Sequence, residues 1–177
     1  SHIKSPYTDE YLSSVNGRIA YMESTRGCPF SCTFCLSGSD HGVRFFNDDF
    51  IKNAILKLWN SGAKTVKFID RTFNAKHEHA MAVWSYIKKH DNGVTNFHFE
   101  ISADLLKEEA IALLNSMREG LVQLEIGVQS TNEETIHAIN RSMDLCKLKA
   151  AVERVNAGKN IHQHLDLIAG LPYEDYE

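Results

Sequence analysis

Strand-like and helix-like segments alternate along this 177-residue chain, and this alternation constrains the fold more than any other feature. Runs that suit a strand are each followed by a stretch in which apolar residues recur at helical spacing. Alternation with short links favours a parallel sheet with right-handed crossovers, so the predicted fold class is α/β. The expected strands are 19–25, 65–69, 96–101, 121–128 and 161–168.

Local signals predict where several helices begin. Asn47 has the side chain of a helix cap, and acidic residues follow it. Thr131 and Glu134 have the spacing of a capping box, which predicts a helix over 131–140. Cys146 lies in a later apolar helical stripe and is therefore expected to be a buried thiol.

Polar and apolar side chains lie on opposite faces of the third, fourth and fifth expected strands. Helices cover the outside of a parallel sheet, so the apolar faces should point toward helices and the polar faces into the interior. Burying polar groups without partners is costly. We therefore expect the interior to be a ligand cavity, with polar residues that include His98, Glu125 and His164.

Three cysteines, Cys28, Cys32 and Cys35, follow the first expected strand with the spacing C-x3-C-x2-C. Their thiolates can hold three irons of a cubane cluster and leave the fourth iron without a protein ligand, whereas ordinary clusters are held by four cysteines. An open coordination position is typical of a reactive metal centre. The spacing thus predicts a cluster with one open iron.

Other uses of these cysteines remain open at this point. Zinc is usually bound by two separated Cys or Cys/His pairs, which this spacing does not match. Disulfides form in oxidising compartments, and no signal peptide is visible, so the usage of cysteine predicts a cytoplasmic protein.

Composition argues against two classes of partner. The net charge of −4 gives no general drive toward nucleic acid, because such binding rests largely on neutralising phosphates. No apolar run approaches the ~20 residues that a membrane span requires. Neither a nucleic-acid nor a membrane partner is expected.

The cysteine segment resembles that of the radical S-adenosylmethionine (SAM) superfamily, and Phe34 fills the aromatic position before the third cysteine. The resemblance implies a 4Fe–4S cluster on Cys28, Cys32 and Cys35, with SAM bound to the open iron. It also implies reductive cleavage of SAM to a 5′-deoxyadenosyl radical that abstracts hydrogen from a substrate, which is an oxygen-sensitive chemistry.

The resemblance extends to the ends of the later strands. Asp70, Arg71 and Thr72 occupy the place of a Gly-Gly-Glu motif that meets the SAM amino group, although this sequence departs from that motif. Gln129 lies in a G-V-Q-S motif whose glutamine contacts SAM, and Asp166 begins a D-L-I-x-G-L-P motif whose aspartate binds the ribose. The other implied SAM contacts are Glu100 and, for the carboxylate, Arg141.

For the fold, the resemblance implies a partial (β/α)6 TIM-like barrel of parallel strands. This chain would hold about five βα units of it as a C-terminally truncated core at 18–177, preceded by a linker or tag remnant at 1–17. The segment around the cysteines is most like the subgroup that carries an N-terminal cobalamin-binding domain. That subgroup includes the anaerobic magnesium-protoporphyrin IX monomethyl ester oxidative cyclase and various methyltransferases.

The expected cofactors are thus a 4Fe–4S cluster and SAM, with cobalamin as a further candidate through an upstream domain absent from this sequence. The expected partners are a small-molecule substrate, for which a tetrapyrrole-like molecule is one candidate, and an electron donor such as flavodoxin or ferredoxin. The alternative function is a non-catalytic iron–sulfur or zinc module for electron transfer or structure. An ordered set of SAM contacts favours the enzyme, because an electron carrier needs no partner for a SAM carboxylate.

Overall fold

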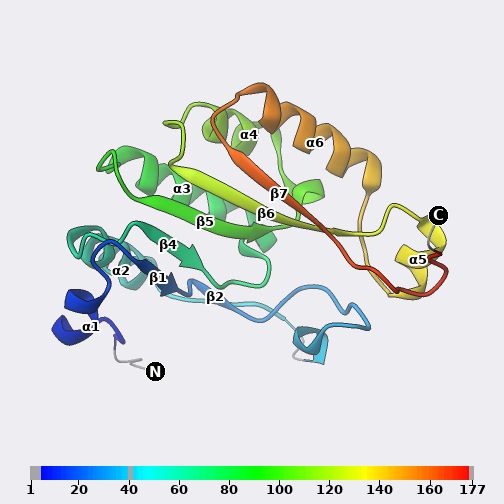
Figure 1. Ribbon diagram of the computed structural model, residues 1–177, viewed down its shortest axis with the longest axis horizontal. Helices are drawn as coiled ribbons and strands as arrows, with labels where there is room; N and C mark the ends of the chain where they lie inside the picture. Colours follow the sequence, from blue (N-terminus) through cyan, green and yellow to red (C-terminus); the bar gives the residue numbers. More distant parts are fainter. Residues whose placement is uncertain (1–4, 40–41, 176–177) are drawn as a thin grey trace.

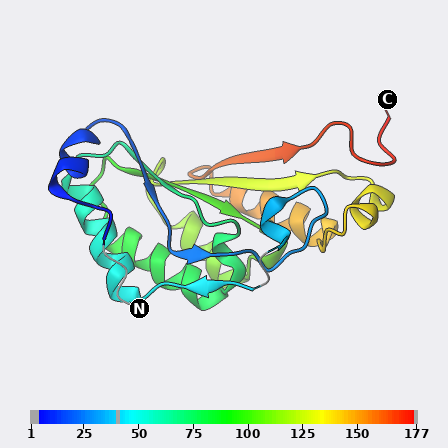
Figure 2. The same cartoon turned by 90° about the horizontal axis from the view of Figure 1, so that it is seen from below.

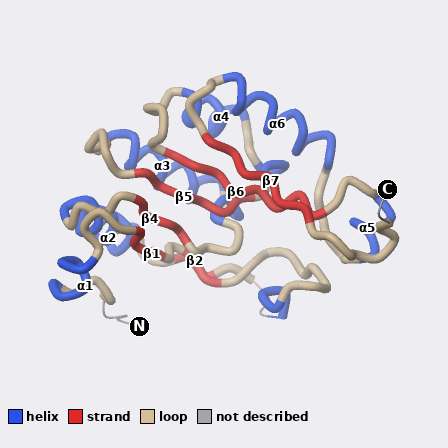
Figure 3. Tube along the Cα trace, in the orientation of Figure 1, coloured by secondary structure: helices blue, strands red, loops and turns tan. Residues whose placement is uncertain are grey.

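The computed structural model describes residues 5–39 and 42–175. Its centre is a five-stranded, all-parallel sheet in the order β1-β4-β5-β6-β7 (Figures 1 and 3). This arrangement confirms the predicted α/β class, and within the described ranges the sheet does not close into a barrel. The strands are β1 (Ile19–Met22), β4 (Thr65–Phe68), β5 (Asn96–Ile101), β6 (Val122–Gln129) and β7 (His162–Leu167).

The long helices lie along one face of this sheet, and no long helix of the described residues covers the other face (Figure 2). No helix in the described part of the chain is long and apolar enough to cross a membrane. The α-helices are α1 (Asp9–Ser14), α2 (Asp48–Asn60), α3 (His77–Lys89), α4 (Glu108–Asn115), α5 (Glu133–Ala138) and α6 (Leu145–Ala157). Shorter elements are β2 (Thr25–Arg26), β3 (Arg44–Phe45) and the 3-10 turns η1 (Leu36–Ser39), η2 (Phe73–Ala75) and η3 (Ala103–Leu105).

The core lies between the sheet and the helices and is rich in aromatic side chains. The ring of Phe99 packs 4.5 Å from that of Phe68 and 4.4 Å from that of Phe73, measured between centroids. Trp84 of α3 meets Phe99 edge-on, and all four side chains are fully buried. Strand alternation places Phe68 and Phe99 on the helix-covered face, as the sequence predicts.

Strand β7 departs from that pattern at its carboxyl end. Gln163 donates a hydrogen bond from Nε2 to the carbonyl of Val152 in α6, at 3.1 Å. Leu165 and Leu167 lie on the same face of the strand as Gln163, yet their side chains are 47% and 69% exposed. The described helices leave this part of the edge strand uncovered, so the expectation of a helix-covered apolar face is wrong here.

Three local expectations are corrected. The first strand ends at Met22 rather than at residue 25, because the chain leaves the sheet to form β2. Asn132, not Thr131, caps α5. Cys146 is exposed rather than buried, because it lies two residues before Leu148 and so faces away from the buried stripe of α6.

The described part of the segment expected to be a linker, residues 5–17, packs against the core. Tyr7 and Val15, which flank α1, are buried, and the Tyr7 hydroxyl donates to the Tyr21 carbonyl at 3.2 Å.

Candidate functional site

A loop closed at its base carries the three cysteines. β2 and β3 pair antiparallel, with Thr25 opposite Phe45, and this pairing joins the two ends of the loop. Gly27 has φ +100°, and a Cβ placed there would lie 2.1 Å from the carbonyl oxygen of Gly42. The entry to the cysteine loop therefore requires glycine, for its backbone conformation and for the close approach.

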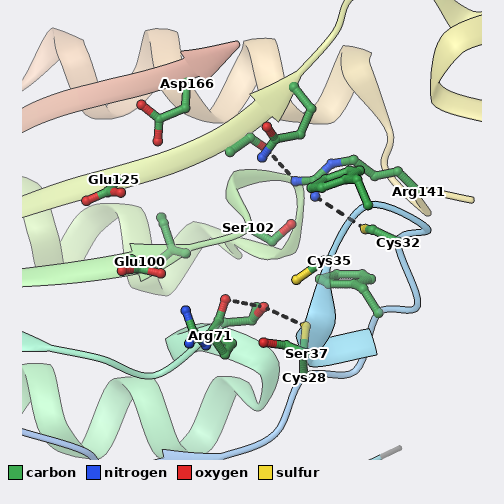
Figure 4. Close-up of a pocket in the computed structure, with 16 residues that line it drawn as sticks. Cys28, Cys32, Cys35, Ser37, Arg71, Glu100, Ser102, Glu125, Arg141 and Asp166 are labelled. Carbon is green, nitrogen blue, oxygen red and sulfur yellow. Dashed lines mark hydrogen bonds between the residues drawn. The ribbon is translucent and has the colours of Figure 1, made fainter. Parts of the chain in front are cut away.

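The cysteines are all free thiols but differ in exposure. Cys32 is buried, Cys28 is partly buried and Cys35 is exposed. The Cys28 sulfur lies 3.5 Å from Thr72 Oγ1, and the Arg141 guanidinium donates from Nη1 to the Cys32 sulfur at 3.8 Å (Figure 4). Two of the thiols thus contact residues from the far side of the site.

A cavity of about 220 Å³ opens where this loop faces the carboxyl ends of the strands (Figure 4). Carboxyl ends of parallel strands are the usual ligand-binding edge of an α/β sheet. Every site residue expected from the sequence lines this cavity except Asp70. These lining residues are Cys28, Cys32, Phe34, Cys35, Arg71, Thr72, Glu100, Gln129, Arg141 and Asp166.

Asp70 is turned away from the cavity and is 1% exposed. It lies two residues after Phe68, so it shares the helix-covered face of the sheet. Its carboxylate accepts hydrogen bonds from Ser24 Oγ at 2.9 Å and Thr25 Oγ1 at 2.5 Å, and Ser24 Oγ is in turn 2.9 Å from His79 Nε2. Burial raises the pKa of Asp70 above its ordinary value, although these hydrogen bonds oppose the rise.

Charged side chains pair on the helix-free face of the sheet. Lys67 Nζ lies 3.0 Å from Glu125 and 3.7 Å from Glu100, and His98 Nε2 lies 2.8 Å from Glu125. Glu100 and Glu125 also line the cavity, as Figure 4 shows. The expectation that His98 and Glu125 face away from the helices is confirmed. The expectation that they and His164 line the ligand cavity holds only for Glu125, because neither histidine is among the lining residues.

The two carboxylates of this face have opposite pKa shifts. Burial and the neighbouring Glu125 carboxylate raise the pKa of Glu100. Burial also acts to raise the pKa of Glu125, but the hydrogen bond and charge of Lys67, together with His98, outweigh it and lower that pKa. Glu125 is therefore the closer and more readily ionised partner of Lys67, and Glu100 has the weaker ion pair.

Backbone strain marks the end of β6. Gln129 has φ +71°, an uncommon conformation for a residue other than glycine, at a register irregularity between β6 and β7. A Cβ at Gly127 would lie 2.3 Å from Gln129 Nε2, so a larger residue there would require the Gln129 side chain to move. Arg141 donates from Nη2 to the Gly127 carbonyl, while its Nε is buried without an acceptor. Strained residues of this kind gather at ligand sites.

Several cavity residues were not expected from the sequence, although strand alternation could have indicated two of them. Gly127 lies two residues after Glu125, and Ser102 lies two residues after Glu100, so each pair shares a face. The loop residues carried no such signal, because nothing in their sequence shows which way they point. The unexpected lining residues are Phe30, Ser37, Ile101, Ser102 and Gly127.

The donor set suits a cluster better than a single ion. Among residues 5–39 and 42–175, no three cysteine, histidine or carboxylate side chains converge closely enough to hold one metal ion. The three thiols instead line one cavity without converging on a single point, as suits donors to separate irons of one cluster. The positively charged guanidinium of Arg141 lies beside them and has no acidic partner among its hydrogen bonds, which suits an anionic ligand.

Comparison with known proteins agrees with this geometry. The model of the Radical SAM superfamily matches residues 22–177. The chain is 25% identical over 168 residues to the cobalamin-dependent radical SAM methyltransferase TokK of Streptomyces tokunonensis, an alignment that covers 88% of this chain and 24% of TokK.

Two solved structures show the same fold. One is the radical SAM methyltransferase TsrM of Kitasatospora setae with cobalamin and a [4Fe-4S] cluster bound, with a TM-score of 0.76 and 16% identity over 93% of this chain and 33% of TsrM. The other is the cobalamin-dependent SAM radical enzyme OxsB with aqua-cobalamin and SAM bound, with a TM-score of 0.70 and 16% identity over 85% of this chain and 24% of OxsB. The chain therefore spans between about a quarter and a third of the length of these relatives.

Proposed function

Because the chain belongs to the radical SAM superfamily, whose cofactors are a 4Fe–4S cluster and SAM, we propose that its cavity is the site of SAM cleavage. The supporting observation is that Cys28, Cys32 and Cys35 line the same cavity as polar side chains from several strand ends. When bound, the cluster and SAM supply a 5′-deoxyadenosyl radical. The protein's contribution is to hold and orient these groups and to exclude water from them.

The cavity residues divide by the chemistry of the groups they suit. The Arg141 guanidinium offers a planar donor fork to the methionine carboxylate. Glu100 and Asp166 are acceptors for the ribose hydroxyls or the ammonium group, and Gln129 offers both a donor and an acceptor. Phe34 provides an apolar wall beside the cysteines.

Arg71 departs from the role that its sequence position implies. Its guanidinium has only donors, so it cannot accept a hydrogen bond from the SAM ammonium group. A backbone carbonyl is the acceptor available there, and that of Arg71 already accepts from Thr72 Oγ1 at 2.8 Å. We assign the exposed Arg71 side chain to an anionic group of SAM or of the substrate.

For the overall reaction, we propose a cobalamin-dependent methyl transfer to a small-molecule substrate. The support is that TokK and TsrM are named as radical SAM methyltransferases, and TokK as cobalamin-dependent. Cobalamin would be held by a part of the protein outside this sequence. Hydrogen abstraction from the substrate belongs to this proposal, whereas a cyclase acting on a tetrapyrrole has no support from these relatives.

The experiment uses the full-length protein, reconstituted anaerobically with iron and sulfide and then reduced in the presence of SAM. We expect 5′-deoxyadenosine and methionine by mass spectrometry, and methylcobalamin with S-adenosylhomocysteine when reduced cobalamin is added. Cys32→Ala should abolish cluster and products, whereas Cys146→Ala removes an exposed thiol outside the cavity and should change neither. An intact, reducible cluster that yields none of these products would favour the non-catalytic module.

A further inference from the structure

The three residues that follow α5, Ile139 to Arg141, hold the middle of the cysteine loop from both sides of Cys32. The Thr33 amide donates to the Ile139 carbonyl at 2.9 Å, and Asn140 Nδ2 donates to the Ser31 carbonyl at 3.0 Å. Arg141 donates to the sulfur of Cys32 itself. We call residues 139–141 the clamp.

The backbone of the clamp is the end of α5 and not a free loop. Asn140 N donates to the His137 carbonyl at 3.0 Å, and Arg141 N donates to the Ile136 carbonyl at 3.1 Å. Together with φ +52° at Asn140, these bonds form a Schellman motif. Glycine is the usual residue at the left-handed position, but asparagine also tolerates it and keeps a side chain. Asn140 therefore ends the helix and supplies the donor to Ser31.

The clamp is held by the rest of the fold at two points. The side chain of Ile139 is buried in a small apolar cluster with Ile136 and Leu171. The Arg141 guanidinium also donates to the carbonyl of Gly127, at the carboxyl end of β6. Because the clamp is bonded to the end of β6, its hydrogen bonds to the loop fix the position of Cys32 relative to the sheet.

We propose that the clamp sets the position of Cys32 before the cluster is loaded, with Asn140 and Arg141 as positioning residues. Hydrogen bonds at Ser31 and Thr33 fix the backbone on either side of the thiol, so the loop need not be ordered by the metal. A guanidinium donor to a cluster sulfur also raises the reduction potential, because it stabilises the more negative state. The inference rests on the proposed function only in taking Cys32 as a cluster ligand.

The first test needs no metal. In the metal-free full-length protein, hydrogen exchange of a peptide covering 28–35 is compared among the wild type, Asn140→Asp and Asn140→Gly. Asp keeps the size of the side chain but cannot donate to Ser31, and Gly keeps the left-handed backbone without any side chain. Both should speed exchange of the loop about five-fold, as expected for one hydrogen bond, with α5 still folded. Asn53→Asp, at an exposed site on α2, is the charge-matched control and should change nothing.

The second test reads the cluster in the absence of SAM. Iron content after a fixed reconstitution time should fall in both Asn140 variants. Arg141→Lys keeps the charge but cannot donate to Gly127 and Cys32 together, so it should lower the midpoint potential and alter the electron paramagnetic resonance spectrum of the reduced cluster.

Unchanged exchange at 28–35 in the Asn140 variants would overturn the proposal. Faster exchange with iron content and potential equal to the wild type would also overturn it, because the clamp would then be a structural contact only. A wild-type protein that binds no cluster would instead contradict the proposed function, and the metal-free exchange would still decide whether the clamp orders the loop.

Discussion

The two faces of strand β5 carry opposite kinds of side chain. Phe97 and Phe99 are fully buried against the helices, while His98 and Glu100 on the opposite face are partly exposed and belong to a network of charges. Neighbouring residues of this strand therefore have different roles, because one set packs in the core and the other belongs to the charged site. In β5, replacing an odd-numbered residue should mainly affect stability, and replacing an even-numbered residue should mainly affect ligand binding.

The largest expected effect is on the packed face. Phe99→Ala removes a fully buried ring that contacts Phe68, Phe73 and Trp84, so we expect the free energy of unfolding to fall by about 3–5 kcal/mol. Urea denaturation measures this loss. The adjacent variant Glu100→Gln, by contrast, should change stability by less than about 0.5 kcal/mol. Equal losses in the two variants would break the comparison.

The next effect is on the open face. Glu100→Gln keeps the size of the side chain but removes the charge, so SAM should bind the cluster-loaded full-length protein roughly 10- to 100-fold more weakly, as for one charged hydrogen bond. Isothermal titration calorimetry measures this affinity. A conservative change on the packed face, Phe99→Leu, serves as the control and should leave SAM affinity near that of the wild type.

A smaller effect is expected within the charge network itself. Glu125→Gln leaves Lys67 with only the more distant Glu100 as a partner, so stability should fall by about 1 kcal/mol. In a Lys67→Met background the same change should cost less, since the interaction is already lost. A double-mutant cycle by urea denaturation gives this coupling. Zero coupling would show that the two side chains contribute independently to stability.

The smallest effect is a pH dependence of opposite sign at Asp70 and Glu125. The pKa of Asp70 is raised by burial, so its contribution to stability grows as the pH falls from neutral through that pKa toward the unfolded value. The pKa of Glu125 is lowered, so its contribution is present above the unfolded pKa and is lost as the pH falls through the folded pKa. Unfolding free energies of Asp70→Asn and Glu125→Gln, each compared with the wild type between pH 7 and pH 4, should diverge in opposite directions. Parallel trends would show that the two carboxylates have similar environments.

Periodicity was sufficient to predict the sheet and the polar interior, because both follow from side chains that alternate along a strand. The same alternation places Asp70 with Phe68 on the packed face. The family motif had indicated a position in the SAM site for Asp70, and the strand alternation was the better guide. Exposure at Cys146 likewise follows from its offset from Leu148 on α6.

Contacts across long stretches of chain could not be predicted in this way. Asn140 was not expected at the site, because its partner Ser31 lies 109 residues away and no local pattern links them. The left-handed backbone of Gln129 also depends on the register between β6 and β7, which no single strand specifies. Sequence therefore indicates which elements meet at the site more readily than how their loops are held.

The order of the sheet has a consequence for synthesis on the ribosome. Each strand of the sheet pairs with the next one along the chain, so the sheet can grow in steps as the polypeptide emerges from the exit tunnel. The contact between residues 31–33 and 139–141 cannot join this stepwise growth, because its two sides are made far apart in time. The base of the cysteine loop can form early through β2 and β3, but the middle of the loop lacks these bonds until residues 139–141 have left the ribosome. A cluster can therefore meet a fully positioned Cys32 only after β6 has been made.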